Sequence, residues 1–513
     1  MKKTKIFADK NLVVGEISPN LYGSFIEHLG RAVYEGIYEP GHPTADENGF
    51  RRDVIGLIKE LSVPIVRYPG GNFLSGYDWR DGVGPRENRP TRLDLAWFST
   101  ETNEFGTDEF MKWCAVAGIT PMMAVNMGTG TIKDAAQLVE YCNHAGGTTI
   151  SDYRRANGAE QPYGVRYWCI GNEMDGPWQI GHLTADEYGK KALEAAKVMR
   201  WTNGEMVEES GKKWSSAPLK LIVSGSSNHE MKTFPEWDRT VLEHTYRQVD
   251  YLSMHRYYMY DEGNDDPLED FLGSADDMDE YIGTLRATIE YVRAKVRSQK
   301  RVFISFDEWN IWTVTAARKE PLWKKAPHLL EDVYTFQDAL VFAGLMNTLL
   351  NNCDVVKIGC LAQLVNVIAP IMTEKGGGTF KQTSFYPFKY LAGNARGETV
   401  RTFSDSDSFE NMYGSARTVN EAITHDAKNR TVCVSLCNYA QEAREIELEL
   451  RSFGNLKAAE YAEMTSSDLF ATNGFDHPDT VVPHDKELPS VKDGSLVSLT
   501  LPPMSWSFLK FTY

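Results

Sequence analysis

The chain has 513 residues, more than a single hydrophobic core usually organises, so we expect two domains. Hydrophobic residues make up 42% of it and charged residues 24%, which is the composition of an ordinary soluble globular protein. Asp and Glu outnumber Lys and Arg by 71 to 54, and the resulting formal charge of −17 argues against nucleic acid or an anionic membrane as a partner.

The first residues and the cysteines indicate the compartment. MKKTKIFADKNLVVGEISPN has basic side chains but lacks the apolar region that follows them in a secretory signal. No apolar stretch reaches the ~20 residues that span a bilayer. The seven cysteines lie mostly in apolar segments, which predicts buried, reduced thiols. We therefore expect a cytoplasmic protein with no membrane contact.

Strand-like and helix-like segments alternate from residue 21 to about residue 394. The predicted strands cover residues 21–28, 64–72, 120–128, 165–173, 219–227, 249–258, 301–309 and 355–366. The clearest predicted helices cover residues 50–62, 184–201, 278–299 and 333–352. Eight strands that alternate with helices predict an α/β fold of the (β/α)8 TIM-barrel type, which we place at residues 18–394. The alternative, an open doubly wound sheet, would need a glycine-rich phosphate loop after the first strand, and the sequence there is no such loop.

Beyond about residue 395 the chain is predicted to be all β. Segments such as TVCVSLCNY, EIELELRSF and GSLVSLTL alternate apolar and polar residues and are separated by turn formers. This pattern predicts a jelly-roll-like β-sandwich. The opening segment KTKIFADKNLVVGEIS is also strand-like, so we assign residues 1–17 together with 395–513 to the second domain.

Chemically reactive side chains gather where the predicted barrel strands end, which is where a TIM barrel carries its functional groups. Strand by strand, these ends provide Glu27 with His28, Arg67 with Asn72, Asn126, Asn172 with Glu173, Ser226 with Ser227 and Asn228, His255 with Tyr257, Asp307 with Glu308, and Gln363 with Asn366. Strand ends that only form turns would be rich in Gly, Ser, Asp and Asn. The acids Glu173 and Glu308 and the base Arg67 are not explained in that way, so the pattern predicts an active site at this rim.

Two of these residues, Glu173 and Glu308, have the placement of a catalytic pair. They end the fourth and seventh predicted strands, whose tips face each other across the mouth of a closed eight-stranded barrel. Glycoside hydrolysis needs one carboxylic acid to protonate the leaving oxygen and a second carboxylate beside the anomeric carbon. If the two carboxyl groups lie ~5 Å apart, the second attacks the sugar and configuration is retained. Their proximity would also keep one protonated while the other is ionised.

Neighbouring residues fit supporting roles. Arg67 would hold Glu308 ionised through charge-assisted hydrogen bonds, and Tyr257 would donate a further hydrogen bond to it. Asn172 is placed to hold a sugar hydroxyl. Flat apolar faces for a sugar ring would come from Trp97, Trp309 and Trp312. Each of these residues also has a structural explanation, which is strand bridging for Arg67 and core packing for the aromatic residues.

Other motifs give weaker signals. DEGNDD (261–266) begins like a calcium loop, but Leu272 stands at its twelfth position instead of Glu. KGGG (375–378) lacks the spacing and the Ser or Thr of a P-loop. His28 and His255 lie at strand ends without an evident carboxylate partner, so we expect no metal and no cofactor, and we expect His255 to position its neighbours.

Longer motifs indicate a family. IGNEMDGPWQ, RYPGGNFLSGYDWRDGVGPRENRP, LDLAWFSTETNEFGTDEF, ISFDEWNIW and LAQLVNVIAPIMT resemble the intracellular α-L-arabinofuranosidases of glycoside hydrolase family 51. The resemblance runs from near residue 12 to the C-terminus. It implies a (β/α)8 barrel with a β-sandwich, a retaining double displacement without metal, and a homohexamer built as a trimer of dimers or a dimer of trimers.

The resemblance also implies roles for individual residues. Glu173 in GNE corresponds to the acid/base, and Glu308 in FDEWN corresponds to the nucleophile. Sugar-binding positions correspond to Glu27, Asn72, Asn172, Tyr257 and Gln363, and pocket-lining aromatic positions correspond to Trp97 and Trp312. Arg256 is charged where the family resemblance implies an uncharged residue.

The leading hypothesis is a retaining exo-α-L-arabinofuranosidase. It would release terminal non-reducing α-L-arabinofuranosyl residues from arabinan, arabinoxylan and, above all, imported arabino-oligosaccharides. A related retaining glycosidase, such as a β-xylosidase or an endo-glucanase, would use the same carboxylate pair. A carbohydrate-binding or scaffolding protein is the alternative outside enzymes, and the presence of both glutamates argues against it.

Overall fold

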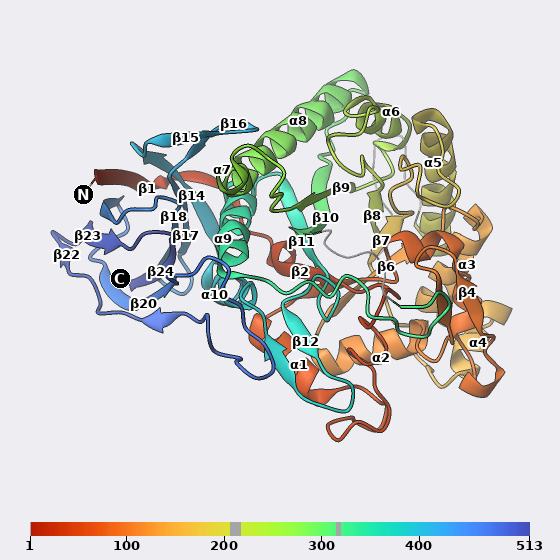
Figure 1. Cartoon of the computed structure of the whole chain (residues 1–513). Coiled ribbons are helices and arrows are strands. Elements are labelled where there is room, and N and C mark those ends of the chain that lie inside the picture. The colour runs from red at the N-terminus through yellow and green to blue at the C-terminus, as the bar shows by residue number, and fades with distance from the viewer. Residues whose placement is uncertain (1, 206–216, 314–319) are drawn as a thin grey trace.

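The computed structural model describes residues 2–205, 217–313 and 320–513, which form a barrel joined to a β-sheet domain (Figure 1). Eight of the described strands close into the barrel, and neighbouring strands in it are parallel. In chain order they are β2 (Gly23–Phe25), β3 (Ile65–Tyr68), β6 (Thr120–Val125), β7 (Tyr167–Ile170), β8 (Lys220–Val223), β9 (Tyr251–Tyr258), β10 (Phe303–Ile311) and β11 (Val356–Ala362). The predicted TIM barrel is confirmed, although most of its strands are shorter than the apolar segments that predict them.

Helices follow the barrel strands and cover the outside of the barrel (Figure 1). In the described residues they are α1 (Arg52–Leu61), α2 (Thr107–Ala117), α3 (Ile132–Asn143), α4 (Thr149–Ala156), α5 (Ala185–Thr202), α6 (Glu236–Thr245), α7 (Pro267–Leu272), α8 (Ser274–Lys295), α9 (Phe336–Asn351) and α10 (Phe385–Asn394). The four predicted helices correspond to α1, α5, α8 and α9. At the start of α5 the side chains of Thr184 and Glu187 each accept a hydrogen bond from the other's backbone N–H, as the sequence pattern requires.

The second domain is a sheet of ten described strands in the order β21-β20-β24-β18-β17-β14-β1-β19-β23-β22. Its members are β1 (Lys2–Glu16), β14 (Glu398–Ser404), β17 (Val419–Asp426), β18 (Thr431–Asn438), β19 (Arg444–Arg451), β20 (Lys457–Thr465), β21 (His484–Asp485), β22 (Val491–Lys492), β23 (Leu496–Leu501) and β24 (Ser505–Thr512). Leu448 and Leu509 come from opposite halves of this order and belong to one core, so the sheet curls over itself. The predicted all-β domain with its N-terminal strand is confirmed, and the proposed residue limits of the two domains stay a prediction.

Helix α9 lies between the barrel and the sheet (Figure 1). Its side chains are buried from Phe336 to Leu350, which explains why its sequence is apolar on every face. Tyr390 of α10 contacts the rings of Trp506 and Phe508 in β24, with ring centroids 5.6 and 5.3 Å apart. Apolar residues of the barrel and of the sheet therefore form one continuous core.

The described residues also contain three short hairpins that the sequence does not predict. They are β4 (Arg92–Asp94) with β5 (Ser99–Glu101), β12 (Ile371–Thr373) with β13 (Thr379–Lys381), and β15 (Ser408–Asn411) with β16 (Gly414–Arg417). The first hairpin lies in the connection after β3 and the second in the connection after β11. Both therefore stand at the end of the barrel where the predicted site residues gather.

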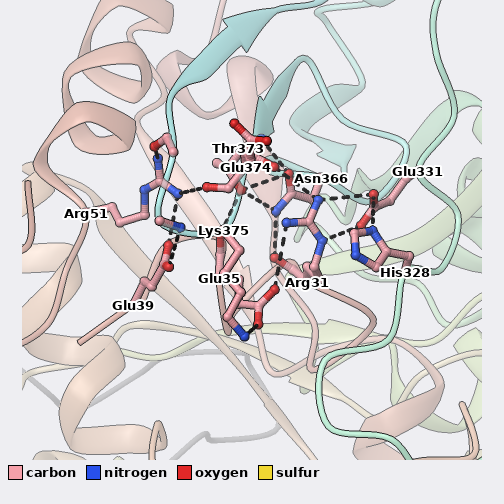
Figure 2. Close-up of polar contacts among 12 residues, drawn as sticks. Arg31, Glu35, Glu39, Arg51, His328, Glu331, Asn366, Thr373, Glu374 and Lys375 are labelled. Atoms are coloured by element: carbon pink, nitrogen blue, oxygen red, sulfur yellow. Dashed lines mark hydrogen bonds and ion pairs between the residues drawn. The ribbon is translucent and has the colours of Figure 1, made fainter. Parts of the chain in front are cut away.

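Hydrogen bonds of arginine residues join the connections at this end of the barrel to one another (Figure 2). Arg31, which follows β2, donates to the carboxylate of Glu331 at 2.7 Å and to the carbonyl of Thr373 at 3.0 Å. The side-chain amide of Asn366 donates to the carbonyl of Arg31 at 2.9 Å. Segments that follow β2, β10 and β11 are thus joined close to the strand ends that carry the candidate residues.

The cysteines agree with the prediction of buried, reduced thiols. All seven are described, and all seven are buried and free. Burial raises the pKa of Cys114 well above its usual range, which keeps this thiol protonated and unreactive. Over residues 2–205, 217–313 and 320–513, no helix combines the length and the apolar character that a membrane crossing requires.

Candidate active site

Asn172 and Glu173 stand where barrel strand β7 ends. Gly171 follows the strand with a φ of +84°, and Glu173 itself adopts a φ of +44°. A left-handed backbone is unfavourable for glutamate, and strain of this kind concentrates at functional sites. The turn brings the carboxylate of Glu173 to the side chain of His255 on strand β9, at 2.9 Å.

Strand β10 brings two consecutive acids, Asp307 and Glu308, to the same place. In a regular strand, neighbouring side chains point to opposite faces. Here the pairing of β10 with β9 shifts its register between Ser305 and Glu308. Because of this irregularity, both carboxylates approach Arg67 of β3: Glu308 lies 2.6 Å from one terminal nitrogen and Asp307 lies 3.7 Å from Nε.

The two glutamates singled out by the sequence meet in the mouth of the barrel. A carboxylate oxygen of Glu173 and one of Glu308 lie within 4.8 Å of each other. The side chain of Glu173 is 11% exposed and that of Glu308 is 7% exposed, so both are shielded from bulk water. This approach fits the ~5–5.5 Å spacing of the carboxyl groups in retaining glycosidases better than the ~6.5–9.5 Å spacing in inverting ones.

Arg67 and Tyr257 hold the carboxylate of Glu308 from two sides. One terminal nitrogen of Arg67 donates to Glu308 Oε1 at 2.6 Å, and the other donates to Asn172 Oδ1 at 2.7 Å. The hydroxyl of Tyr257 donates to Glu308 Oε2 at 2.8 Å. Burial lowers the pKa of Arg67. The negative charges of Asp307 and Glu308 outweigh burial and raise this pKa well above its usual range. Glu308 therefore has one fixed orientation and a permanent positive partner.

His255 lies among three carboxylates. Its Nδ1 is 2.9 Å from Glu173 and 3.6 Å from Glu308, and its Nε2 is 3.2 Å from Asp307. Burial lowers the pKa of His255, but the charge of Glu308 and the contacts with Asp307 and Glu173 outweigh burial and raise the pKa to about 10. Burial also opposes the ionisation of Asp307, yet Arg67 and His255 bring its pKa below the usual range. The imidazolium thus links the two glutamates and partly balances their charge.

Glu27, at the end of β2, forms the second part of the site. Its Oε1 accepts hydrogen bonds from the indole of Trp97 at 2.7 Å and from the backbone N–H of Phe73 at 2.8 Å. Its backbone N–H donates to the side-chain oxygen of Gln363 at 2.9 Å. Burial raises the pKa of Glu27 well above its usual range, and the charge of Glu308 acts in the same direction. A Cβ atom at position 71 would lie 2.2 Å from this carboxylate, so Gly71 is the residue that gives Glu27 its space.

The remaining predicted sugar contacts lie beside these groups. The amide of Asn172 donates to Asn72 Oδ1 at 3.4 Å, which joins the ends of β7 and β3. The ring of Trp312 meets that of Tyr257 edge to face, with centroids 5.4 Å apart. The structure therefore brings the predicted site residues of β2, β3, β7, β9, β10 and β11 to one cluster. Their roles toward a sugar stay predictions.

Trp309 and Arg256 are among the residues that lie outside this cluster. Trp309 is buried against Phe342 of α9, with ring centroids 5.1 Å apart, because it follows Glu308 in the strand and points to the opposite face. It packs the barrel wall and offers no face to a sugar. Arg256 likewise points outward, where it donates to Asp277 of α8 at 3.2 Å and to Glu230 at 2.8 Å. Its charge therefore belongs to the packing of α8 and has no direct contact with the cluster.

The expectation that the histidines lack carboxylate partners is wrong. His255 contacts three carboxylates, and Nδ1 of His28 lies 2.7 Å from Glu101 in the hairpin that carries Trp97. The other ring nitrogen of His28 lies 2.7 Å from the hydroxyl of Tyr68. The pair of His28 with Glu101 is hidden from the sequence, because Glu101 belongs to a hairpin that the sequence does not predict.

Glu173, His255 and Glu308 could in principle hold a metal ion, since one ligand atom of each lies within 4.8 Å of the others. The surrounding charges disfavour this use. Arg67 already donates to Glu308, and His255 is a cation at neutral pH because its pKa is raised to about 10. A protonated imidazole has no lone pair for a metal, and Arg67 occupies one oxygen of Glu308, so the cluster favours the binding and transfer of protons over the binding of a metal.

Two further residues of the cluster are not singled out by the sequence. The indole of Trp178 donates to Glu173 Oε2 at 2.7 Å, and the hydroxyl of Ser253 donates to Asp307. Trp178 lies five residues after Glu173 in the same connection, so an aromatic donor close to the acid was a usable signal. Ser253 carries no such signal, because its contact depends on the irregular register of β10.

Comparisons with known proteins agree with this geometry. The family model described as Alpha-L-arabinofuranosidase 1 domain matches residues 57–265, and the model described as Alpha-L-arabinofuranosidase C-terminal domain matches residues 307–505. The chain is 48% identical to the intracellular exo-α-(1→5)-L-arabinofuranosidase 1 of Bacillus subtilis, over 99% of both chains. It is 46% identical to the exo-α-(1→6)-L-arabinofuranosidase of Bifidobacterium longum, over 99% of this chain and 97% of that protein.

Solved structures have the same architecture. A family 51 α-L-arabinofuranosidase from Bifidobacterium longum superposes with a TM-score of 0.92 at 42% identity, over 100% of both chains. An α-L-arabinofuranosidase from Thermotoga maritima, solved as an arabinose complex, superposes with a TM-score of 0.86 at 32% identity, again over 100% of both chains. The likeness therefore extends over the barrel, the sheet domain and the way they are joined.

Proposed function

The chain belongs to the α-L-arabinofuranosidases of glycoside hydrolase family 51, and from this membership we propose that it is a retaining exo-α-L-arabinofuranosidase. It releases terminal non-reducing α-L-arabinofuranosyl residues from arabinan, arabinoxylan and arabino-oligosaccharides. The observation that carries the mechanism is the approach of Glu173 and Glu308 to within 4.8 Å.

In the first step the carboxylate of Glu308 attacks the anomeric carbon and forms an ester bond with the sugar. The bond between that carbon and the leaving oxygen breaks, and Glu173 gives its proton to this oxygen. Arg67 and Tyr257 donate to the two oxygens of Glu308, which supports a nucleophile that is ionised and correctly aimed.

In the second step Glu173 is a carboxylate and acts as the base. A water oxygen attacks the anomeric carbon, its proton passes to Glu173, and the ester bond to Glu308 breaks. Arabinose leaves with its original configuration, and both glutamates return to their starting protonation.

The hydrogen-bonding groups of the site support action on single terminal residues. Glu27, Asn172 and Gln363 are almost fully buried and already hydrogen-bonded within the protein, so only their remaining hydrogen-bonding capacity needs a partner when a ligand displaces water from the site. An arabinofuranose bound at its anomeric carbon has three free hydroxyls that meet this need. A sugar without matching hydroxyls would leave buried polar groups unpaired, and a site built in this way rejects such a sugar strongly.

Replacement of Glu308 by Ala tests the assignment. We expect turnover of an aryl α-L-arabinofuranoside to fall by roughly 10⁴-fold or more, the scale seen when a nucleophile is removed. Azide should restore turnover and give an arabinofuranosyl azide of inverted configuration, because the small anion replaces the missing carboxylate. The wild-type enzyme should be far less active on an aryl β-xyloside. Full activity of the variant, or an azide product of retained configuration, would contradict the proposed role of Glu308.

We also propose that the enzyme is cytoplasmic and acts chiefly on imported oligosaccharides. Relatives with 48% and 47% identity carry the word intracellular in their names, which supports this compartment. For the assembly we propose a homohexamer, built as a trimer of dimers or a dimer of trimers, on the strength of the family resemblance. Light scattering on the purified enzyme would contradict it by giving a mass other than that of six chains.

A further inference from the structure

Trp178 contacts the residue that the proposed mechanism uses as both acid and base. Its indole nitrogen lies 2.7 Å from Oε2 of Glu173. The other carboxylate oxygen, Oε1, lies 2.9 Å from Nδ1 of His255. Both oxygens of Glu173 are therefore met by ring nitrogens, one from its own connection and one from strand β9.

The chain between Glu173 and Trp178 brings the indole to this position. The backbone N–H of Gly176 donates to the carbonyl of Glu173 at 2.9 Å, which turns the chain back toward the carboxylate. A Cβ atom at position 176 would lie 2.6 Å from Cε2 of Trp178, so glycine is needed for the ring to lie against this turn. Trp178 is 48% exposed, so core packing does not account for its position.

The chemistry of an indole makes this contact selective for one protonation state. An indole N–H donates a hydrogen bond and cannot accept one, whereas an ionised carboxylate only accepts. A donor of this kind stabilises the ionised form of a carboxyl group relative to the neutral acid. We propose that Trp178 is a positioning residue that stabilises the ionised, base form of Glu173 and so limits the pH range over which Glu173 can act as the acid. This inference rests on the proposed function, because it concerns the two roles of Glu173.

Other titratable groups also surround Glu173, and the proposal has to be tested against their background. His255 and Tyr257 come from β9, Glu308 comes from β10, and Asp175 comes from the same connection as Trp178. Arg67 and Asp307 stand one contact further away, bound to Glu308 and to His255, respectively. Trp178 is uncharged, so its replacement by Phe removes one donor and leaves all of these charges in place.

The test is the pH dependence of kcat/KM for Trp178→Phe on an unactivated arabino-oligosaccharide. With a poor leaving group, the alkaline limb of this profile reports the loss of the catalytic proton from the free enzyme. Without the indole donor we expect the limb to move to higher pH by roughly 0.5–1 unit, with activity at the optimum within ~10-fold of wild type. On an aryl substrate whose turnover is limited by the second step, the acid limb of kcat should move in the same direction. A profile that coincides with that of the wild type would overturn the proposal.

Two controls separate this effect from general effects of removing a tryptophan. Trp201 on α5 is 62% exposed and is absent from the cluster, so Trp201→Phe should leave the pH profile unchanged. The double variant, which carries both Trp178→Phe and Glu173→Ala, should have the same pH profile as Glu173→Ala alone. An additional shift in the double variant would show that Trp178 acts through another group, and would also overturn the proposal.

The same set of variants distinguishes failure of the inference from failure of the proposed function. If Glu173→Ala keeps full activity on the unactivated substrate, Glu173 is not the acid and the proposed function is wrong at this residue. If Glu173→Ala spares only substrates with good leaving groups while Trp178→Phe leaves both limbs in place, the acid/base assignment stands and the role of Trp178 is wrong.

Discussion

At the scale of single residues, the site has to balance several buried negative charges. Four acids, Glu27, Glu173, Asp307 and Glu308, lie nearly buried within one cluster, and isolated carboxylates are costly to bury. Arg67 is one compensating cation. The other is His255, whose pKa is raised to about 10 because the carboxylates around it outweigh its burial. This balance makes the stability of the fold depend on pH in a direction that can be worked out.

A raised pKa in the folded state means that folding takes up a proton at neutral pH. The stabilisation is fully present below the unfolded histidine value of about 6.5 and is lost as the pH rises through about 10. We therefore predict that wild type is more stable than His255→Gln at pH 7, and that the gap narrows as the pH approaches 10. Calorimetric melting at pH 7, 8, 9 and 10 measures the gap. A gap that stays constant or widens with pH would show that His255 is not charged in the folded enzyme.

The sequence predicts which residue types reach the mouth of the barrel, and it predicts only some of their contacts. Arg67 and Glu308 could be paired in advance because both end barrel strands at the same rim and opposite charges attract. The place of Asp307 could not, because strand alternation points it away and only the shifted register of β10 returns it to the site. By the same alternation, the side chain of Trp309 points away from the site and packs in the core. Trp178 depends on a tight turn at Gly176 that no periodicity reveals.

At the scale of elements, the connections at the barrel mouth are held by buried arginines rather than by apolar packing alone. Arg51, just before α1, donates to Glu39 at 3.0 Å and to the carbonyls of Glu374 and Gly377 at 2.9 Å each (Figure 2). It also pairs with Asp53 at 2.6 Å. The motif KGGG, which the sequence leaves without a function, is thereby explained as the turn of the β12–β13 hairpin that this guanidinium clamps.

We predict that Arg51→Ala lowers the free energy of unfolding by about 3–5 kcal/mol, because it leaves buried carbonyls and two partly buried carboxylates without their cation. Arg51→Lys should recover only part of this loss, since an ammonium cannot reproduce the planar fork. Arg52→Ala is the matched control: Arg52 is exposed, and its pair with Glu47 at 3.6 Å is exposed too, so the change should stay within ~0.5 kcal/mol. Urea unfolding of the three variants measures the change in the free energy of unfolding. Equal losses for Arg51→Ala and Arg52→Ala would contradict the proposed role of Arg51 in holding the β12–β13 hairpin.

Long periodic elements are predictable and short ones are not. Helix α5 has eighteen residues and a capping box, and the barrel strands have apolar runs, so both emerge from periodicity alone. The hairpin β4–β5 has three residues in each strand and no alternation to detect. It exists because buried contacts such as His28 with Glu101 hold it against the barrel, and these contacts join residues far apart in the sequence.

At the scale of the whole molecule, the two domains depend on each other through the first strand and a shared core. Strand β1 pairs with β14 on one side and with β19 on the other, so it stands inside the ten-stranded sheet. Helix α9 is buried on all faces because the barrel and the sheet cover it from opposite sides (Figure 1). The barrel that carries the catalytic cluster therefore has one wall that is complete only when the sheet is intact.

Deletion of residues 2–16, which removes strand β1, should therefore destabilise the barrel as well as the sheet. It divides the sheet between β14 and β19 and exposes two strand edges, which invites aggregation. We predict that the shortened chain loses its single cooperative melting transition and binds a hydrophobic dye, with loss of arabinofuranosidase activity. Replacing residues 408–416, most of the separate β15–β16 hairpin, with a short loop is the matched control. Among the described strands this hairpin pairs only with itself, and keeping Arg417 preserves its ion pair with Glu421 of β17, so the change should leave the ten-stranded sheet intact. A shortened chain that melts cooperatively at the wild-type temperature would mean that the barrel holds the sheet in place without β1.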